Sequence, residues 1–286
     1  MPELSDIHYI KELLSRHDFR FSKSLGQNFI TDPELCPRIA REGGAEKGVS
    51  ALEIGPGIGV LTAELAKRAD RVVAVELDKA LLPILSETLA EHDNVEIVCG
   101  DALELDLTAL AREKFGDSPF VVCANLPYYI TSPLLMRLLE SRLPARSITV
   151  MVQKEAADRI TAAPGTRECG AISAAVRYYS DAVKLFGVPR SSFVPQPGVD
   201  SAVMRLTVLG EPSVSVRDEK LFFRVIKAAF GQRRKTLANS LSSGLSLPKA
   251  ECARAIEASG LGPNARAEEL TLPQFAALSE QVAALC

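Results

Sequence analysis

Short and almost continuous apolar runs alternate with helix-like segments in the first half of the chain. Between the first two runs, residues 59–68 carry apolar side chains at 60, 61 and 65 and end in basic residues, which is typical of an amphipathic helix. Strands without polar alternation indicate a parallel sheet covered on both faces. We therefore predict an α/β fold with a doubly wound, mainly parallel sheet. The predicted strands are Ser50–Ile54, Arg71–Val75, Val95–Val98, Phe120–Cys123, Ser147–Val152 and Ser201–Leu209.

The pattern changes after Val208, where Gly210 and Pro212 interrupt the chain. No later run has the character of a strand, and apolar residues recur at helical spacing between Gly, Pro and Asn breaks. We therefore predict two domains, an α/β domain over residues 1–209 and a small all-helical domain over residues 210–286. The helices predicted in the second domain are Glu219–Phe230, Lys235–Leu241, Pro248–Ser259 and Leu272–Ala284.

Composition limits the class of protein. Of 286 residues, 47% are apolar and 24% charged, so the chain can bury a large core and is not broadly disordered. It shows neither a basic-then-apolar leader nor an apolar run of membrane-span length, which favours a cytoplasmic protein. The six cysteines have no paired spacing and there are only three histidines, so we expect neither a disulfide framework nor a metal site. No apolar surface pattern demands a partner, and we expect a monomer.

The overall charge argues mildly against a nucleic-acid partner, because the net charge is −3 and the pI about 5.8. Locally the balance is different. Between Lys220 and Lys235 there are six basic residues and no acid. A second, looser basic set consists of Lys11, Arg16, Arg20 and Lys23. Such patches suit phosphate contacts, although an ordinary solvated helix face can have the same composition.

Glycines follow the first predicted strand. Residues 53–59 read Glu-Ile-Gly-Pro-Gly-Ile-Gly, and glycines between a strand and a helix let the backbone approach a ligand closely. The spacing differs from the dinucleotide fingerprint G-x-G-x-x-G, because Val60 occupies the last position. An ordinary tight turn uses glycines too, so this segment alone is a weak signal.

Acidic residues follow the next two strands. Glu76 lies 21 residues beyond Gly55, where a carboxylate can accept hydrogen bonds from both hydroxyls of a ribose. Capping a helix is the alternative role, and Asp78 suits that role better. Asp101, followed by Ala102, ends the third strand. Because open α/β sheets bind ligands at the carboxyl ends of their strands, these endings predict one binding site.

The acids also decide between ligands. Glu53 would repel a diphosphate cofactor unless a cation intervened. S-adenosylmethionine has a ribose and an adenine without a phosphate, and its ammonium and sulfonium groups are positive, so it suits an acidic pocket better. A nicotinamide or nucleotide enzyme is the alternative.

The fourth strand ends in Asn125-Leu126-Pro127-Tyr128. The exocyclic amine of adenine is a poor nucleophile, because its lone pair is delocalised into the ring. An Asn oxygen and a backbone carbonyl can accept both of its N–H groups and so direct the lone pair at a methyl group. Pro127 would hold the backbone in place, and Tyr128 would stack on the base. This chemistry needs no general base, in agreement with the lack of a candidate histidine. The alternative interpretation of residues 125–128 is a plain turn with core tyrosines.

Together these motifs resemble the class I methyltransferases that modify adenine N6, and more narrowly the ribosomal RNA small-subunit adenine dimethyltransferases. The narrower resemblance runs from about residue 22 to the C-terminal region. Besides the motifs above, it is carried by residues 23–29 (Lys-Ser-Leu-Gly-Gln-Asn-Phe), 152–155 (Val-Gln-Lys-Glu), 193–201 (Phe-Val-Pro-Gln-Pro-Gly-Val-Asp-Ser) and 230–237 (Phe-Gly-Gln-Arg-Arg-Lys-Thr-Leu).

The resemblance implies transfer of two methyl groups from S-adenosylmethionine to N6 of each of two adjacent adenosines. These would lie in a hairpin loop near the 3′ end of 16S rRNA, in the maturing small subunit. Asn125 and Leu126 would receive the amine and Tyr128 would stack on the target base. The catalytic residues implied in this way are Asn125, Leu126, Pro127, Tyr128 and Phe193, the last as a second aromatic near the base.

The same resemblance implies cofactor contacts, including some from an N-terminal segment over residues 1–30. Gly55 would lie along the methionine part of the cofactor, Glu76 would bind the ribose and Asp101 the adenine. The full set is Asn28, Ile30, Glu53, Gly55, Gly57, Glu76, Asp101, Ala102 and Asn125. Residues expected to contact RNA are Lys23, Arg224, Lys227, Arg233, Arg234 and Lys235.

One position departs from the family, which often has Asn where this chain has Tyr129; we expect that side chain to lie away from the substrate. The related 23S rRNA methyltransferases usually have Ile in Asn-x-Pro-Tyr and lack the pattern at 193–201, which favours the small-subunit interpretation. A DNA adenine methyltransferase would more often show Asn-Pro-Pro-Tyr or its Asp form, with a sizeable target-recognition domain. An assembly factor with secondary catalysis is the alternative from another class.

Overall fold

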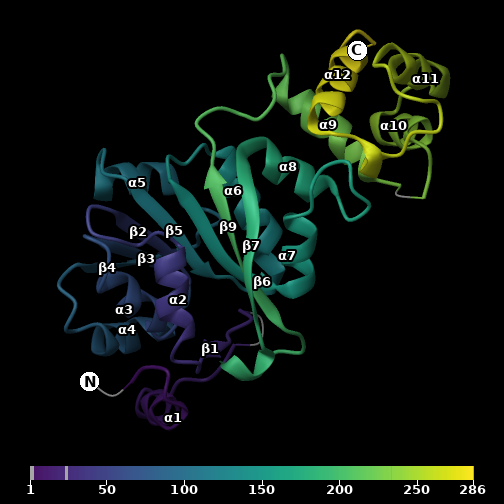
Figure 1. The fold of residues 1–286 in the computed structure, drawn as a ribbon. Coiled ribbons are helices and arrows are strands. Elements are labelled where there is room, and N and C mark those ends of the chain that lie inside the picture. The colour runs from purple at the N-terminus through teal and green to yellow at the C-terminus, as the bar shows by residue number, and fades with distance from the viewer. Residues whose placement is uncertain (1–2, 23–24, 233, 286) are drawn as a thin grey trace. The chain divides into compact units, whose positions relative to one another are not determined.

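The computed structural model describes the whole chain except residues 1–2, 23–24, 233 and 286. The chain divides into two compact units, and Figure 1 shows the elements of each. The first unit consists of Met1–Ala157 and Val183–Val208, and the second of Asp158–Ala182 and Leu209–Cys286.

A seven-stranded sheet forms the centre of the first unit, in the order β4-β3-β2-β5-β6-β9-β7. Neighbours from β4 to β6 run parallel, and β9 runs antiparallel to β6. This confirms the predicted doubly wound α/β fold. The strands named so far are β2 (Ser50–Ile54), β3 (Val72–Glu76), β4 (Val95–Cys99), β5 (Phe120–Asn125), β6 (Ser147–Gln153), β7 (Ser180–Val188) and β9 (Ser201–Val208).

Helices cover this sheet because their apolar faces complete its core. Ile39 of α2 and Leu65 of α3, for example, are buried with Ala51 of β2 and Val121 of β5 in one hydrophobic cluster. The helices before residue 161 are α1 (Ile7–Arg16), α2 (Leu35–Glu42), α3 (Val60–Ala66), α4 (Leu82–Thr88), α5 (Leu107–Phe115), α6 (Thr131–Glu140) and α7 (Lys154–Ile160).

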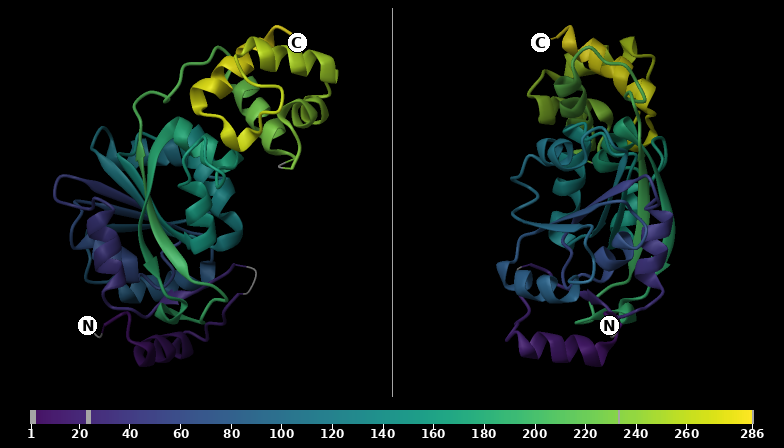
Figure 2. Two further views of the ribbon diagram at one scale, coloured as in Figure 1. Left: turned by 45° about the vertical axis from the view of Figure 1, so that its right-hand side comes forward. Right: turned by 90° about the vertical axis from the view of Figure 1, so that its left-hand side faces the viewer.

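A small antiparallel sheet joins two distant parts of the first unit. β1 (Phe29–Ile30) pairs with β8 (Phe193–Val194), so that Ile30 lies opposite Phe193. In Figures 1 and 2, α1 lies beyond the end of the large sheet near β1. The N-terminal segment therefore runs beside the chain that leads into β9.

The sequence missed β7, and the reason is its mixed composition. Asp181, Lys184 and Gly187 interrupt its apolar residues, and four of its nine residues are exposed. A strand at the edge of a sheet has only one neighbour, so it does not need the continuous apolar pattern of a central strand.

Apart from residues 180–182, which begin β7, the regular structure described in the second unit is helical. Helices α9, α10, α11 and α12 of this unit pack on one another (Figure 1). Its core contains the fully buried Phe222, Leu241 and Phe275. The helices are α8 (Ala171–Tyr179), α9 (Glu219–Phe230), α10 (Leu237–Leu245), α11 (Lys249–Ala258) and α12 (Leu272–Ala283). The prediction began α10 two residues too early, because Lys235 belongs to the turn before it.

Residues 158–182 were predicted to belong to the α/β domain, but they group with the helical unit. Aromatic packing explains the difference. The ring of Tyr178 lies 5.1 Å from that of Phe222, and Tyr179 stacks on Phe223 at 5.6 Å. Both tyrosine hydroxyls also hydrogen-bond to the Glu219 carboxylate. These contacts join α8 to α9 across a long stretch of sequence, which no local pattern reveals.

Candidate active site

The carboxyl ends of β2, β3, β4 and β5 meet in one cleft of about 1080 Å³, counted to its open mouth. The strand register brings them together. Ile54 pairs with Val75 on one side and with Ala124 on the other, and Glu76 pairs with Cys99. The groups that follow these strands therefore converge on one edge, as expected for an open α/β sheet.

The N-terminal segment forms a wall of this cleft. Residues 25–30 all line it. The Asn125 amide nitrogen donates to the backbone carbonyl of Asn28 at 3.3 Å, and the Asn28 amide donates to the carbonyl of Gly26 at 2.9 Å. Gln27 donates to the Asp78 carboxylate at 2.6 Å. These hydrogen bonds join the segment to the ends of β5 and β3.

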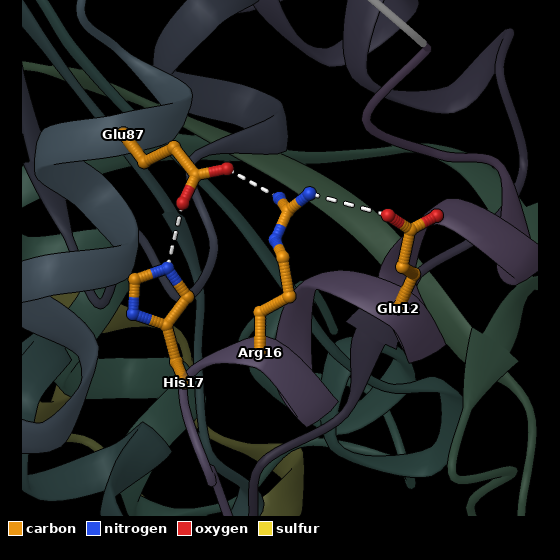
Figure 3. Close-up of polar contacts among 4 residues, drawn as sticks. All are labelled: Glu12, Arg16, His17 and Glu87. Carbon is orange, nitrogen blue, oxygen red and sulfur yellow. Dashed lines mark hydrogen bonds and ion pairs between the residues drawn. The ribbon is translucent and has the colours of Figure 1, made fainter.

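An ion-pair network holds α1 against α4. Figure 3 shows Glu87 of α4 between Arg16 and His17, with Arg16 also reaching Glu12. His17 Nε2 lies 2.7 Å from Glu87 Oε2. Since α1 precedes the wall of the cleft in the chain, this network anchors the segment before that wall against α4.

We expect Glu87→Gln to lower the free energy of unfolding by less than about 1 kcal/mol, because the side chains involved are partly exposed. Urea unfolding at low salt and at about 1 M salt would measure the effect, which should shrink as salt screens the charges. Glu12→Gln removes only a pair within α1 and serves as the matched control. An equal loss in the two variants would contradict the anchoring role of Glu87.

All three glycines of the loop after β2 have backbone conformations that favour glycine, with φ of +71° at Gly55, +60° at Gly57 and +92° at Gly59. A Cβ on Gly57 would lie 3.3 Å from the ring of Phe29, so this glycine allows the wall to pack closely. A Cβ on Gly55 would meet nothing within 4 Å. The backbone at Gly55 is therefore open to a ligand in the cleft.

Glu53 is buried, with 1% of its surface exposed, and its Oε2 has no hydrogen-bond partner among the described residues. Burial raises the pKa of this carboxyl from 4.5 to about 8, although the nearby Thr62 hydroxyl opposes the rise, and the neighbouring Glu76 carboxylate adds to it. A buried oxygen without a partner is costly unless a ligand satisfies it. A cationic group in the cleft would do so and would favour the ionised form.

Glu76 is also buried, but its two oxygens have partners. Oε1 accepts from the backbone N–H of Asp78 at 2.7 Å and Oε2 from that of Gly57 at 3.3 Å. Burial raises the pKa of Glu76, while these N–H groups oppose the rise. Each carboxylate oxygen can accept a second hydrogen bond. In the same cleft, Asp101 Oδ1 accepts from the backbone N–H of Leu103 at 2.8 Å.

The end of β5 presents hydrogen-bond acceptors. The Asn125 amide nitrogen is used by Asn28, so the amide oxygen remains as an acceptor. The Leu126 N–H donates to the carbonyl of Met151 at 3.1 Å, which holds the backbone against β6. Tyr128 Oη lies 3.1 Å from Oγ of the buried Ser201, the first residue of β9. The Tyr128 ring is thereby fixed at the edge of the cleft.

Comparison with known proteins identifies the family. Residues 18–284 match the model of the ribosomal RNA adenine dimethylase family. The chain belongs to this family. It is therefore an S-adenosylmethionine-dependent rRNA adenine dimethyltransferase, as the motifs predicted.

Curated relatives agree with the assignment to the dimethylase family. A protein of Alkaliphilus oremlandii is 48% identical over 99% of both chains, and one of Geobacillus thermodenitrificans is 50% identical over 94% of this chain and 93% of its own. Both are named ribosomal RNA small subunit methyltransferase A. Among solved structures, the 23S rRNA methyltransferase ErmE is 28% identical, with a TM-score of 0.67 over 89% of this chain and 99% of its own. A dimethyladenosine transferase from Plasmodium falciparum shares the fold, with 24% identity and a TM-score of 0.72 over 87% of this chain and 95% of its own.

The cleft of this dimethylase fits its methyl donor. The open space at Gly55 leaves room for a ligand against the backbone. The Oε2 atom of Glu53 has no hydrogen-bond partner among the described residues, and an ammonium group of the ligand would provide one. Glu76 retains acceptor capacity for ribose hydroxyls. The residues therefore suit a cationic nucleoside without phosphate.

The structure brings every predicted cofactor-contacting and catalytic residue into this one cleft, although their individual roles remain predictions. Phe193 is among them, mostly buried, and reaches the cleft through the pairing of β8 with β1. The predicted residues that line the cleft are Asn28, Ile30, Glu53, Gly55, Gly57, Glu76, Asp101, Ala102, Asn125, Leu126, Pro127, Tyr128 and Phe193.

The residues that sequence reasoning did not assign to the dimethylase site include Gln27, Leu77, Tyr129 and Ser201. Gln27, Leu77 and Tyr129 line the cleft, and Gln27 also donates to Asp78. Ser201 acts through its partner Tyr128, a contact that only the folded chain reveals. We expected Tyr129 to lie away from the substrate, and its place in the lining argues against that expectation. Its position next to Tyr128 was the available signal.

The predicted RNA-contacting residues belong to other parts of the chain. Arg224 and Lys227 line a second hollow in the helical unit, together with Gln232, Ser240 and Ser243. Arg234 and Lys235 are exposed in the turn before α10. Arg233 and Lys23 lie outside the described residues.

Proposed function

We propose that this dimethylase modifies two adjacent adenosines in a hairpin loop near the 3′ end of 16S rRNA, adding two methyl groups to N6 of each. The curated relatives named above act on the small subunit and share about half of their residues with this chain, whereas ErmE shares 28%. We further propose that the substrate is the immature small subunit, met in the cytoplasm, and that the enzyme works as a monomer.

The orientation of Asn125 is the observation that carries the proposed chemistry at adenine N6. Because its amide nitrogen donates to Asn28, its oxygen is left to accept one N–H of the target amine. The backbone carbonyl of Leu126 would accept the other. Pro127, with φ of −55°, holds this backbone, and the fixed ring of Tyr128 would stack on the adenine. Phe193 would add a second aromatic contact.

This arrangement favours a pyramidal N6 whose lone pair is directed at the methyl group. The cofactor would supply an electrophilic methyl group on a sulfonium, whose sulfur would keep the electron pair of the cleaved S–C bond while N6 gained the N–C bond and lost one proton to solvent. Asn28, Ile30, Gly55 and Glu76 would position the cofactor, and Asp101 and Ala102 would border its adenine. Most of the rate would come from this positioning and from electrostatics.

We propose that the exposed cations of the helical unit bind RNA phosphates. Arg224 and Lys227 lie one turn apart on α9, and no ion pair is found for either in the described part of the chain. The hydroxyls and the amide beside them in the same hollow suit phosphate oxygens. Arg234 and Lys235 would extend this surface. Such local charge allows a protein of net charge −3 to bind RNA.

Replacing both Arg224 and Lys227 by Gln should weaken binding to small subunits and reduce its dependence on salt. Each lost phosphate contact should lower the slope of log K against log salt by about 0.7 to 0.9. Filter binding over a salt series would measure the slope. Lys220→Gln, on the same helix but outside the hollow, is the matched control. An unchanged slope in the double variant would contradict the proposed contacts.

The decisive test uses purified protein, labelled S-adenosylmethionine and small subunits from a strain that lacks this modification. Nucleosides from the digested RNA would then be identified. We expect N6,N6-dimethyladenosine in the 16S fraction. Label found instead in 23S rRNA or DNA would overturn the proposed substrate, and subunit binding without transfer would indicate an assembly factor.

A further inference from the structure

Tyr129 has an unusual position for an aromatic residue. It lines the cleft beside Tyr128, yet 57% of it is exposed. No other large apolar side chain in the described part of the chain is more exposed. Leaving an aromatic ring in water forgoes the stabilisation of burying it, so such a ring at the mouth of a binding cleft suggests a ligand contact.

The backbone that carries Tyr129 is well ordered by local hydrogen bonds. It lies in the short 3₁₀ helix Tyr128–Ile130, where the N–H of Ile130 donates to the Pro127 carbonyl at 3.2 Å. The Thr131 hydroxyl donates to the same carbonyl at 3.4 Å. The ring lies beside the wall of the cleft, since a Cβ built on Gly26 would come 3.9 Å from two of its carbons.

The two neighbouring tyrosines differ in how they are held. Tyr128 is partly buried and its hydroxyl lies beside Ser201, whereas no hydrogen bond is found for the Tyr129 hydroxyl within the described residues. Tyr128 is therefore fixed toward the protein, and Tyr129 offers an exposed ring at the mouth of the same cleft. A ring with this exposure and support can stack on a flat partner at little conformational cost.

We propose that Tyr129 forms a nucleobase subsite that stacks on the base next to the target adenosine. This subsite rests on the proposed function, in which the substrate is an RNA strand with one base in the cleft. Tyr128 and Tyr129 lie in a 3₁₀ helix of three residues per turn, so their side chains point in directions about 120° apart. The two rings can therefore contact two different bases, the target in the cleft and its neighbour at the mouth.

The subsite has a specific consequence for a substrate with two adjacent adenosines. While one adenosine is held by Asn125 and Tyr128, its neighbour is held by Tyr129. Tyr129 should therefore affect the binding and register of the RNA, while the cofactor, contacted by other residues, should bind unchanged. Stacking requires a flat π-surface, so an aliphatic side chain of similar size cannot replace the ring.

The test compares Tyr129→Leu with the conservative Tyr129→Phe, using the small subunits described above. Initial rates over a range of subunit concentrations give KM and kcat, and mass spectrometry of the RNA fragment gives the number of modified adenosines. We expect Tyr129→Leu to raise KM about 5- to 20-fold, with kcat changed less than about 3-fold, and to accumulate RNA modified at one adenosine. Tyr129→Phe should stay within about 2-fold of wild type.

Calorimetric binding of S-adenosylhomocysteine separates this effect from damage to the cleft, and its affinity should be equal in all three proteins. A Leu variant with wild-type KM and wild-type product distribution would overturn the subsite. So would a Phe variant as impaired as the Leu variant, since the ring would then not be the active feature. A wild-type enzyme that forms no dimethyladenosine would instead overturn the proposed function.

Discussion

Replacing Asn125 by Ala should lower kcat for methyl transfer by about 10²- to 10³-fold, the usual cost of losing one preorganised hydrogen-bonding group at a reacting centre. The amide oxygen would no longer accept an N–H of the target amine, so the lone pair would not be directed at the methyl group. Steady-state transfer at saturating cofactor and small subunits would measure the change. Binding to the subunit should persist, because the proposed phosphate contacts lie elsewhere in the chain.

Asn94→Ala is a suitable control for the effect of Asn125→Ala. The Asn94 amide also donates to backbone carbonyls, those of Ala66 at 2.9 Å and Ala69 at 3.1 Å, but it does not line the cleft. Its loss should cost about 1 to 3 kcal/mol of stability and leave kcat unchanged. Asn125→Ala with a normal kcat would contradict the proposed role, and loss of transfer and subunit binding together would contradict the separation of the two surfaces.

Glu53 should make the protein without its cofactor lose stability as the pH rises. The pKa of this carboxyl is raised by burial from 4.5 to about 8, so folding takes up a proton between these two values. The Glu53 contribution to the free energy of unfolding is therefore most favourable below the pKa of this carboxyl in the unfolded chain. It falls by on the order of 4 kcal/mol as the pH rises to about 8. Glu53→Gln is neutral at every pH and should lack this loss.

Urea unfolding of both proteins between pH 5 and 9 would test the prediction for Glu53. Glu96→Gln is the control, since Lys114 and Arg71 lower the pKa of that exposed carboxyl. The ionised Glu96 side chain stabilises the fold, and this stabilisation is lost only as the pH falls. Between about pH 6 and 9 the stability of Glu96→Gln should therefore change with pH as that of wild type does. A Glu53→Gln variant with the same pH profile as wild type would show that Glu53 does not take up a proton on folding.

The sequence predicted most of the cleft because parallel strands end at one edge. Glu53, Glu76 and Asn125 lie at or near the carboxyl ends of strands with a clear apolar pattern, and Asp101 follows another. In a parallel sheet such positions converge whatever the helices between them do. The resemblance to the dimethylase family added Asn28, Ile30 and Phe193. Ile30 and Phe193 lie in strands of two residues each, and Asn28 directly precedes the first of these, so none of the three carries a periodic signal.

Other features depended on contacts between distant residues. The hydrogen bond of Ser201 to Tyr128 spans 73 positions and that of Asn125 to Asn28 spans 97, so no local pattern contains them. The exposure of Tyr129 follows from the place of its turn at the cleft mouth, and the grouping of residues 158–182 follows from aromatic packing on α9.

The sequence by itself therefore determined the six strands with an apolar pattern, the chemistry of the strand ends and the family, because these depend on residue type and spacing. Only the tertiary structure decided which oxygens have partners, which carboxyl is buried without one, and which aromatic ring stays in water. These properties arise from desolvation and packing, which depend on every neighbour that the fold brings near.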